Sequence, residues 1–460
     1  MRSKDKMIAG FSKLSKREKL SWLVRHFFTS SPVDVVREFA SFWHTNVEAQ
    51  KLFDDISENT ITNFYMPYGV APNFLINNKL YCIPMVIEES SVVAAASSGA
   101  KFWYKRGGFQ SKVVSMTKIG HVHFIWHGDP VKFYSFFDKI KADLHNGVKD
   151  ITANMEKRGG GITDVSLAYM PEVEKGYYQI KVEFNTCDAM GANFINSVLE
   201  GFGKILREKA ATYHDFEGSE KELQVVMAIL SNYTPDCVVR SWVECNVEEL
   251  GNFGDMEARE FAQKFVRAIN IAKNDSYRAA THNKGIYNGI DAVVIATGND
   301  FRAIEACGHA YAARKGKYAS LSNAWVHDGT FHFELEVPLA VGTVGGLTKI
   351  HPLAKRSLEL LGNPSAEELM QIISTVGLAQ NFAAIRSLVT TGIQKGHMKM
   401  HLNNILSHFN ATEKEREEAL AYFATETISF SSVRNYLSSL RGDTFQSVSY
   451  THLTLPTNGC

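Results

Sequence analysis

The sequence predicts an α+β protein with at least two domains. Hydrophobic periodicity in the middle of the chain indicates, in order, a strand over 112–128, a helix over 131–158, strands over 162–170 and 176–187, a helix over 189–210 and a strand over 223–232. That succession is typical of a split β-α-β, or ferredoxin-like, domain, which we place at residues 112–230. A chain of 460 residues is long enough to form a second, larger domain around it.

Helical signals dominate the rest of the chain. Residues 12–28 predict a capped amphipathic helix, and the small side chains of 90–103 predict a helix that packs closely inside a domain. Ser365 and Glu368 form a capping box that predicts a long helix over 366–392. Further predictions are strands broken by Pro and Gly over 66–89, a helix over 255–280, a strand over 331–338, and a helix opened by a second capping box at Thr412 and Glu415.

Composition excludes some classes of protein. The chain carries 49 basic and 49 acidic residues, which argues against nucleic acid as the main partner. No apolar run reaches the roughly 18 residues of a membrane span, and the basic N-terminus lacks a hydrophobic signal core. The six cysteines form no CxxC pair, so we expect reduced thiols in a cytosolic protein.

One apolar stretch is flanked by a lysine and an aspartate. The run 291–297 predicts a buried strand, with Lys284 before it and Asp300 after it. We expect the Lys284 ammonium to point into a cleft, where it needs a carboxylate or a ligand anion. Asp300 suits a helix cap and a catalytic carboxylate equally well. Upstream, Glu88 and Glu89 lie between apolar segments, so one of them is expected to have a raised pKa; the pattern does not choose between them.

Two further patterns suggest ligands. His397 and His401 share one helical face but lack the glutamate of HExxH, and the histidines of HVHFIWH (121–127) lack defined partners, so we predict no metal site. None of the glycine runs matches a Rossmann or P-loop pattern. CDAMGANF (187–194) still suits a phosphate at a helix start, although a packed helix start is an equal alternative.

Several stretches match a known family when they are taken together and in order. They are LSKREKLSWL, ENTITNFYMPYGVAPNF, PMVIEESSVVAAAS, DAMGANFINSVLEG, YRAATHNKGIYNGIDAVVIATGNDFRAIEACGHAYAAR, VGTVGGLTKIHPLA, VGLAQNFAAIRSL and GIQKGHMKMH. They span roughly residues 12–408 and resemble the class II, bacterial form of 3-hydroxy-3-methylglutaryl-CoA reductase. The resemblance implies a four-electron reduction of this thioester to mevalonate and free CoA by two NAD(P)H, in the mevalonate pathway of isoprenoid synthesis.

The same resemblance implies roles for individual residues. Glu89 matches the catalytic acid, Lys284 the group that polarises the carbonyl, Asp300 the residue that links and tunes those two, and His397 the proton donor to departing CoA. The substrate positions are Ser91, Arg278, Asn288 and Gln380. The cofactor positions are Asp188, Gly191, Asn193, Asn232 and Thr152.

Thr152 occupies a position where members preferring NADH have an acidic residue. We therefore predict NADPH as the cofactor, with NADH as the alternative. A second departure from the family is Thr62, which replaces the glycine of its ENxIG pattern in ENTIT (58–62), so the loop on the dimer side is expected to differ.

The resemblance also implies the domain organisation. We expect a large, mostly helical domain around a central helix, formed by 1–111 and 231–392, with the ferredoxin-like cofactor-binding domain of 112–230 inserted in it. A mobile helical flap at 393–441 would carry His397, and the tail 442–460 reads as partly non-native. We further expect a cytoplasmic homodimer with a shared active site. The alternatives are the same enzyme running oxidatively with NAD, a CoA-binding homologue without activity, or a metal hydrolase.

Overall fold

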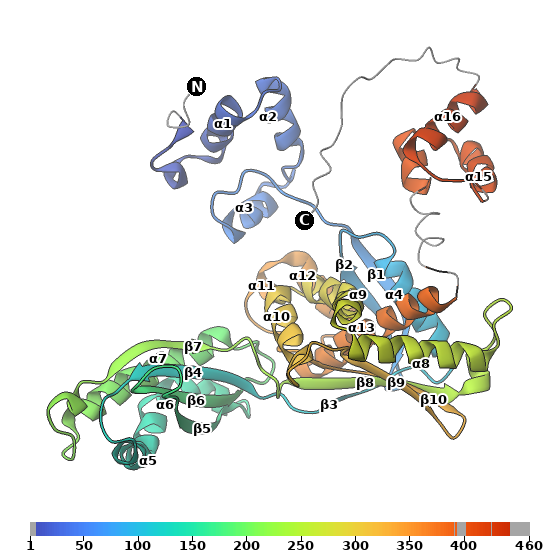
Figure 1. The fold of residues 1–460 in the computed structure, drawn as a ribbon. Coiled ribbons are helices and arrows are strands. Elements are labelled where there is room, and N and C mark those ends of the chain that lie inside the picture. The colour runs from blue at the N-terminus through green and yellow to red at the C-terminus, as the bar shows by residue number, and fades with distance from the viewer. Residues whose placement is uncertain (1–5, 391, 393–401, 425, 442–460) are drawn as a thin grey trace.

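The computed structural model describes residues 6–390, 392, 402–424 and 426–441. Its strands form three sheets (Figure 1). Two of them belong to one part of the fold: the hairpin β1 (Tyr68–Ile76) with β2 (Lys79–Val86), and the four-stranded antiparallel sheet β3 (Gln110–Val113), β8 (Val238–Asn246), β10 (Thr330–Pro338) and β9 (Ser322–His327), in that order. The hairpin turns at Asn77 and Asn78, whose positive φ values of 46° and 65° suit a tight type I′ turn.

The third sheet contains the predicted ferredoxin-like succession. Its strands are β4 (Lys118–Ile125), β5 (Gly161–Tyr169), β6 (Tyr177–Asn185) and β7 (Gln224–Leu230), and its helices are α5 (Pro130–Gly147), α6 (Lys149–Glu156) and α7 (Ala192–Thr212). The spatial order β5-β6-β4-β7 is fully antiparallel. The helices and the sheet share one apolar core that includes Phe124, Phe136 and Phe202.

Two sequence predictions in this region need correction. The strand predicted over 112–128 is two strands in two different sheets, because the chain leaves β3 at Val113 and begins β4 only at Lys118. Backbone amides of Val114, Ser115 and Thr117 bond to carbonyls of Val238 and Asp236, which turns the chain from one sheet to the other. The helix predicted over 131–158 is interrupted at Val148, whose φ of −111° and ψ of 10° separate α5 from α6.

A buried helix lies at the centre of the larger part. α13 (Ala366–Val389) begins at Ser365, whose side chain accepts a bond from the Glu368 amide, as the capping box predicted. The Glu368 carboxylate does not complete the box, because it pairs with Lys79 and Tyr81 instead. α13 is apolar and long enough to cross a membrane, but 72% of its apolar stretch is buried inside the fold, as in the core helix of a soluble protein.

Small residues let three helices approach one another. α4 (Val92–Tyr104) and α9 (Ser276–Ala296) both pack against α13. A Cβ atom at Gly99 of α4 would lie 2.5 Å from the carbonyl oxygen of Ala379, and one at Gly289 of α9 would lie 3.0 Å from that of Val376. The prediction of a closely packed helix over 90–103 is therefore confirmed.

Gly99→Ala should destabilise the protein. The added Cβ meets backbone atoms of α13, which cannot rotate away, so we expect a loss of about 1–3 kcal/mol in the free energy of unfolding. Thermal unfolding measures the loss. Gly285→Ala is the matched control, since nothing lies within 4 Å of a Cβ placed there in the middle of α9. An equal melting temperature for G99A and wild type would contradict the close packing.

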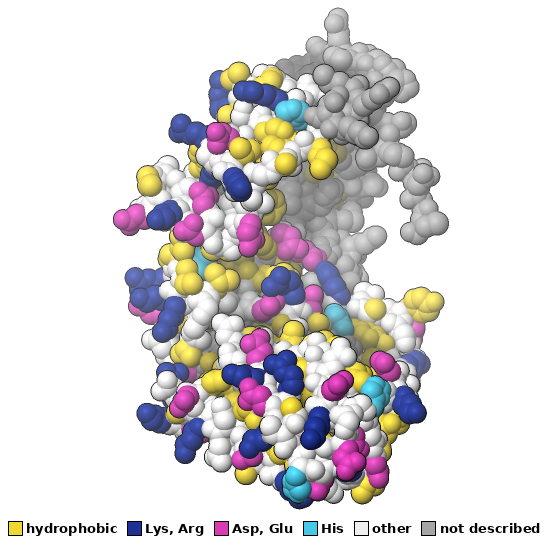
Figure 2. All heavy atoms as spheres, turned by 90° about the vertical axis from the view of Figure 1, so that its left-hand side faces the viewer, with side chains coloured by type: hydrophobic (Ala, Val, Ile, Leu, Met, Phe, Trp, Pro, Cys, Tyr) yellow, Lys and Arg dark blue, Asp and Glu magenta, His cyan; other side chains and the backbone are white. Residues whose placement is uncertain are grey.

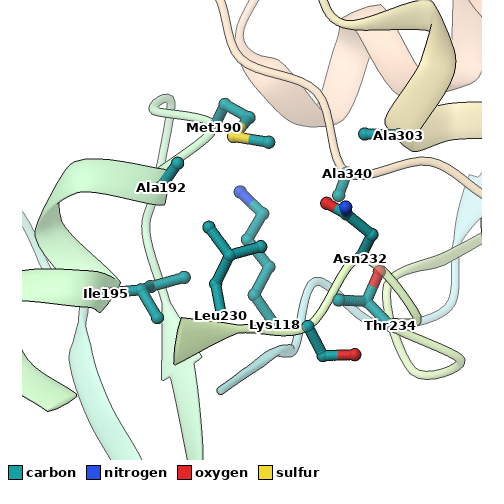
Figure 3. Close-up of a pocket in the computed structure, with 10 residues that line it drawn as sticks. Lys118, Met190, Ala192, Ile195, Leu230, Asn232, Thr234, Ala303 and Ala340 are labelled. Atoms are coloured by element: carbon teal, nitrogen blue, oxygen red, sulfur yellow. The ribbon is translucent and has the colours of Figure 1, made fainter. Parts of the chain in front are cut away.

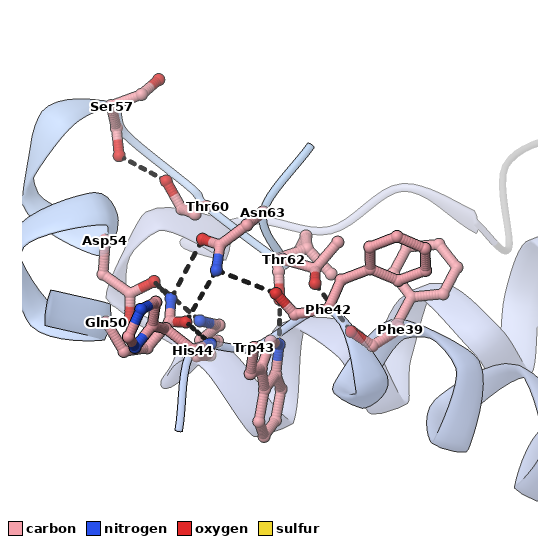
Figure 4. Close-up of polar contacts among 12 residues, drawn as sticks. Phe39, Phe42, Trp43, His44, Gln50, Asp54, Ser57, Thr60, Thr62 and Asn63 are labelled. Carbon is pink, nitrogen blue, oxygen red and sulfur yellow. Dashed lines mark hydrogen bonds and ion pairs between the residues drawn. The ribbon is translucent and has the colours of Figure 1, made fainter. Parts of the chain in front are cut away.

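Helices and short 3-10 helices make up the other elements of the described part of the fold. Further elements are η2 (Phe11–Lys13), α1 (Lys16–Phe27), α2 (Pro32–Ser41), α3 (Val47–Ile56), η3 (Gly218–Lys221), η4 (Val247–Leu250), α8 (Ala258–Asn274), α10 (Phe301–Ala312), α11 (Leu347–Ile350), α12 (Pro352–Leu360), α15 (Glu413–Tyr422) and α16 (Phe430–Arg441). Both predicted caps hold: Ser15 closes a capping box at α1 and Thr412 one at α15. Thr62 donates its hydroxyl to the Phe39 carbonyl at 2.7 Å, so its side chain ties the ENTIT loop to α2 (Figure 4).

Charges of both signs are interspersed over the face shown in Figure 2. This distribution agrees with the balanced composition. The five cysteines among the described residues are free thiols, as the sequence predicted.

Candidate active site

Six of the predicted residues line one cavity. It has a volume of about 500 Å³ and lies between the start of α4, the middle of α9 and the second half of α13. The six are Glu89, Ser91, Arg278, Lys284, Asn288 and Gln380. They come from sequence positions almost 300 residues apart, so the fold and not local sequence brings them together.

Lys284 and Glu89 form an ion pair at the mouth of this cavity. The ammonium nitrogen of Lys284 lies 2.7 Å from Oε2 of Glu89. Asn288 lies one helical turn further along α9, and its side-chain nitrogen is 3.5 Å from the same oxygen. The lysine thus has the carboxylate partner that the sequence required.

The surroundings of this pair differ from the prediction in two respects. Residues 291–297 are not a strand, because α9 runs without interruption from Ser276 to Ala296. The side chains of Lys284 and Glu89 are 61% and 39% exposed in the single chain, so neither lies in the dry environment that we expected. A short apolar run fits a buried helix as well as a strand, and that ambiguity caused the error.

Glu88 faces a different neighbour from Glu89. It adds negative charge near Asp291, which follows Lys284 and Asn288 on the same face of α9. Burial is the main cause that raises the pKa of the Asp291 carboxyl, and Glu305 of α10 and then Glu88 raise it further. The adjacent glutamates therefore differ in their surroundings, since Glu89 contacts Lys284 and the charge of Glu88 acts on Asp291. Sequence reasoning missed Asp291, which it treated as part of an apolar run.

Asp291→Asn should flatten the pH dependence of stability. The folded chain holds the Asp291 proton more tightly than the unfolded chain does, so this group favours folding most below a pH of about 4. That contribution is lost as the pH rises through the raised pKa of the folded state. We expect D291N to gain about 1–3 kcal/mol over wild type at pH 8 and less at pH 5. Thermal unfolding across pH measures this, with Asp138→Asn on the exposed face of α5 as control; parallel profiles for D291N and wild type would contradict it.

Ser91 lines the cavity at the start of α4. It is the N-cap residue of α4 with a φ of 77°, a left-handed conformation that is unusual for a serine, and its hydroxyl makes no capping bond. The hydroxyl and the first amides of α4 are thereby available to an anionic ligand. Such strain is common where a site needs a particular geometry.

On the opposite wall, buried polar groups face the cavity. The Gln380 side chain is 5% exposed, and its buried Oε1 has no hydrogen-bond partner among the described residues. Burial lowers the pKa of the Arg278 guanidinium. His282, which sequence reasoning missed, is buried beside it; burial and the Arg278 charge lower its pKa to about 3. His282 is therefore a neutral ring, held by a 2.7 Å hydrogen bond to Ser322.

Asp300 does not join Lys284 in this chain. It is the N-cap of α10, where its carboxylate accepts the amides of Arg302 and Ala303 and pairs with the Arg302 guanidinium at 3.1 Å. Burial raises its pKa, but these hydrogen bonds outweigh burial and hold it below its ordinary value. About 18 Å of helix separates Lys284 from the end of α9 at Ala296. The expected link between Lys284 and Asp300 is thus absent within one chain.

Three of the predicted cofactor residues lie on or directly after the turn before α7: Asp188, Gly191 and Asn193. Gly191 is the N-cap of α7 with a φ of 94°, and a Cβ there would meet Thr186 at 2.5 Å. No side chain caps α7, so its first amides can face a phosphate. Asn232 lines a small cavity beside this turn, together with Lys118 and Met190 (Figure 3).

Two of the cofactor residues have other contacts. The Asp188 carboxylate accepts the Ala366 amide at 2.7 Å, at the start of α13. Thr152 is 2% exposed on the inner face of α6, so its side chain does not reach the surface where a ribose would lie. The cofactor preference argued from the missing carboxylate at Thr152 stays a prediction.

Two predictions concern residues beyond the described part. His397 and His401 both lie in the range 393–401, outside the described residues. Among the described residues, no group of three or more His, Cys, Asp or Glu side chains could hold a metal ion.

Comparison with known proteins decides the family. The model of the hydroxymethylglutaryl-coenzyme A reductase family matches residues 25–402. The chain belongs to this reductase family. It is 36% identical over 424 residues to 3-hydroxy-3-methylglutaryl-coenzyme A reductase of Archaeoglobus fulgidus, covering 90% of each chain, and 34% identical to a probable reductase of Borreliella burgdorferi, covering 83% of this chain and 85% of the other.

A solved structure of the family supports the same assignment. The class II reductase of Streptococcus pneumoniae, bound to NADPH in open conformations, is 36% identical and matches with a TM-score of 0.69, covering 93% of this chain and all of the other. As a member of the reductase family, the protein is an oxidoreductase that acts on 3-hydroxy-3-methylglutaryl-CoA. The oxidative, inactive and metal-hydrolase alternatives are not favoured.

Proposed function

We propose that the cavity between α4, α9 and α13 binds 3-hydroxy-3-methylglutaryl-CoA and is the place of its reduction to mevalonate and CoA. The observation that carries this proposal is the 2.7 Å pair of Lys284 and Glu89 in a cavity lined by Ser91, Arg278 and Asn288. A cation, a proton donor and groups for a carboxylate and a hydroxyl thus lie together. The second half of the substrate, CoA, would extend past Gln380, whose unpartnered Oε1 can accept a hydrogen bond from it.

The chemistry follows from what these side chains can do. When bound, NADPH supplies a hydride to the carbonyl carbon, twice per turnover. Each hydride leaves negative charge on the carbonyl oxygen, which the Lys284 ammonium stabilises. Glu89 lies within hydrogen-bond distance of Lys284, and in its protonated form it would deliver the proton that the final alkoxide needs, returning to a carboxylate. His397, which we assign from the resemblance, would protonate the thiolate of departing CoA.

A second copy of the chain would complete the site. If Asp300 acts on Lys284, it must come from another protomer, because in one chain about 18 Å of helix lies between Lys284 and the end of α9 that precedes Asp300. Ala303, one turn after Asp300, lines the same small cavity as Asn232. Asp300 therefore lies on the cofactor side, and we propose that this side of one protomer covers the Lys284 side of its partner. The partner would also exclude water from the exposed Lys284 and Glu89 pair.

We propose the following roles for the segments of the chain. Residues 112–230, whose sheet begins at Lys118, form the ferredoxin-like cofactor-binding domain, inserted in a large domain of 1–111 and 231–392. Residues 393–441 form the flap that brings His397 to the site. The protein works as a cytoplasmic homodimer, and the ENTIT loop that Thr62 ties to α2 lies on its dimer side.

NADPH is the proposed cofactor. The turn before α7 fits a phosphate-bearing ligand, since Gly191 leaves no room for a Cβ and no side chain caps the helix. Lys157 and Arg158 are exposed, and the Arg158 carbonyl accepts a bond from Cys187 Sγ at 3.3 Å, which keeps this basic pair beside the turn. A 2′-phosphate would be attracted there. The NADPH-bound relative of Streptococcus pneumoniae supports the same preference.

The test is the stoichiometry of the reaction. With the thioester as substrate, we expect two NADPH oxidised, followed by nicotinamide absorbance, for each CoA thiol released. One NADPH per CoA would indicate that the reaction stops at the aldehyde. Faster turnover with NADH than with NADPH, at equal low concentrations, would contradict the cofactor assignment alone.

A further inference from the structure

We propose that Lys118 is a positioning residue for the turn that receives the nicotinamide cofactor. This inference rests on the cofactor site proposed above. Lys118 is the first residue of β4, and it is only 3% exposed, which is rare for a lysine. Its side chain reaches the turn of residues 186–191, which joins β6 to α7.

The contacts form a closed triangle. The Lys118 ammonium donates to Thr186 Oγ1 at 2.5 Å and to the Ala189 carbonyl at 2.8 Å. The Thr186 hydroxyl in turn donates to the same carbonyl at 2.6 Å. One cation therefore fixes both the beginning and the middle of the turn.

This triangle sets the conformation of the residues that follow. Gly191 packs against the Thr186 side chain, since a Cβ at Gly191 would lie 2.5 Å from Thr186 Cγ2. From the other side, the Asp188 carbonyl accepts the amide of Thr343 at 2.8 Å. With the turn held on both sides, the uncapped amides at the start of α7 keep one direction.

The size of the adjacent cavity argues that Lys118 acts through the turn and not by direct contact with the cofactor. In Figure 3 the ammonium points toward Met190, across from Asn232. This cavity has a volume of about 20 Å³, which is room for about one water molecule and not for a nucleotide. The groups that can touch the cofactor are those on the turn itself.

Burying the Lys118 ammonium costs free energy, so we infer that the charge has a function. Burial lowers the pKa of Lys118, and no carboxylate of the described residues forms an ion pair with it. A methionine of similar length would fill the same space without desolvating an ammonium. The presence of a lysine here therefore indicates that fixing the turn outweighs the free-energy cost of burying its charge.

Lys118→Met separates positioning from stability. We expect the KM for NADPH to rise about ten-fold or more, while the KM for the CoA thioester stays within two-fold and kcat within about three-fold. Melting should occur at or above the wild-type temperature. The control is Lys181→Met on the neighbouring strand β6, where a partly exposed lysine pairs with Glu183. K181M should leave every constant unchanged.

A second pair of variants acts on the acceptor. Thr186→Val keeps the methyl group that packs on Gly191 but removes the hydroxyl, so it should raise the NADPH KM as K118M does. Thr186→Ser keeps the hydroxyl and should stay close to wild type. Combining K118M with T186V should add little to either change, because both break one triangle. If K118M fails to fold, T186V and T186S still test whether this triangle positions the cofactor turn.

The results distinguish two failures. If folded K118M and T186V keep the wild-type KM for NADPH, or if the thioester KM rises in its place, Lys118 does not position the cofactor turn. If wild type itself neither oxidises NADPH nor binds it in equilibrium fluorescence titration, the proposed cofactor site is wrong, whatever the variants do.

Discussion

Replacing Lys284 with alanine is expected to lower kcat by about 10³-fold or more with the thioester substrate. The ammonium lines the cavity in which we place the thioester and pairs with the proposed acid Glu89, and a positioned donor of this kind contributes most in the transition state. Folding should be preserved, because the side chain is 61% exposed and its ion pair is a surface pair that contributes little to stability.

The measurement is steady-state turnover by nicotinamide absorbance, with melting temperature as the check on folding. Lys273→Ala, on the neighbouring helix α8, is the matched control, since Lys273 is exposed and, in the described part of the chain, its ammonium bonds to Asn323 alone. Activity of K284A within ten-fold of wild type would remove Lys284 from its assigned role.

Glu89→Gln should lower kcat by about 10²–10⁴-fold. The amide keeps the size of the side chain but cannot supply a proton, and it removes the charge that holds Lys284 in place. Glu88→Gln changes the adjacent residue in the same way, yet it is Glu89 and not Glu88 that pairs with Lys284, while the charge of Glu88 acts on Asp291. We therefore expect E88Q to remain within about three-fold of wild type. Equal losses in the two variants would show that the site does not distinguish the adjacent glutamates.

Much of the fold was predictable from periodicity. The order of the elements from 118 to 230 and the tight packing of α4 follow from local pattern. Alternating polarity and a run of small residues can both be recognised within a short stretch of sequence. The strand β8 was overlooked although Val239, Ser241 and Val243 alternate inward with outward residues. α9 was misassigned in part because its last turns are apolar on every side, so they lack the polar face of an amphipathic helix.

The site was predictable in its parts and not in its arrangement. The family resemblance named Glu89, Lys284 and the groups around them, and the fold brings those into one cavity. Asp300 does not reach Lys284 within one chain, and their relation in a dimer stays a prediction, because sequence spacing says nothing about which protomer supplies a side chain. The burial of Thr152 was likewise not predictable, since a match to a family motif does not reveal that a side chain points into the core.

The most direct test of the shared site mixes two inactive variants. Lys284→Ala and Asp300→Asn each remove one member of the proposed cluster, and asparagine keeps the N-cap of α10. If each site takes Lys284 from one protomer and Asp300 from the other, half of the randomly mixed dimers contain one intact site. Co-expressed variants should then recover about a quarter of wild-type activity. No recovery in mixed dimers, with tagged chains proving that they form, would contradict a site built from two protomers.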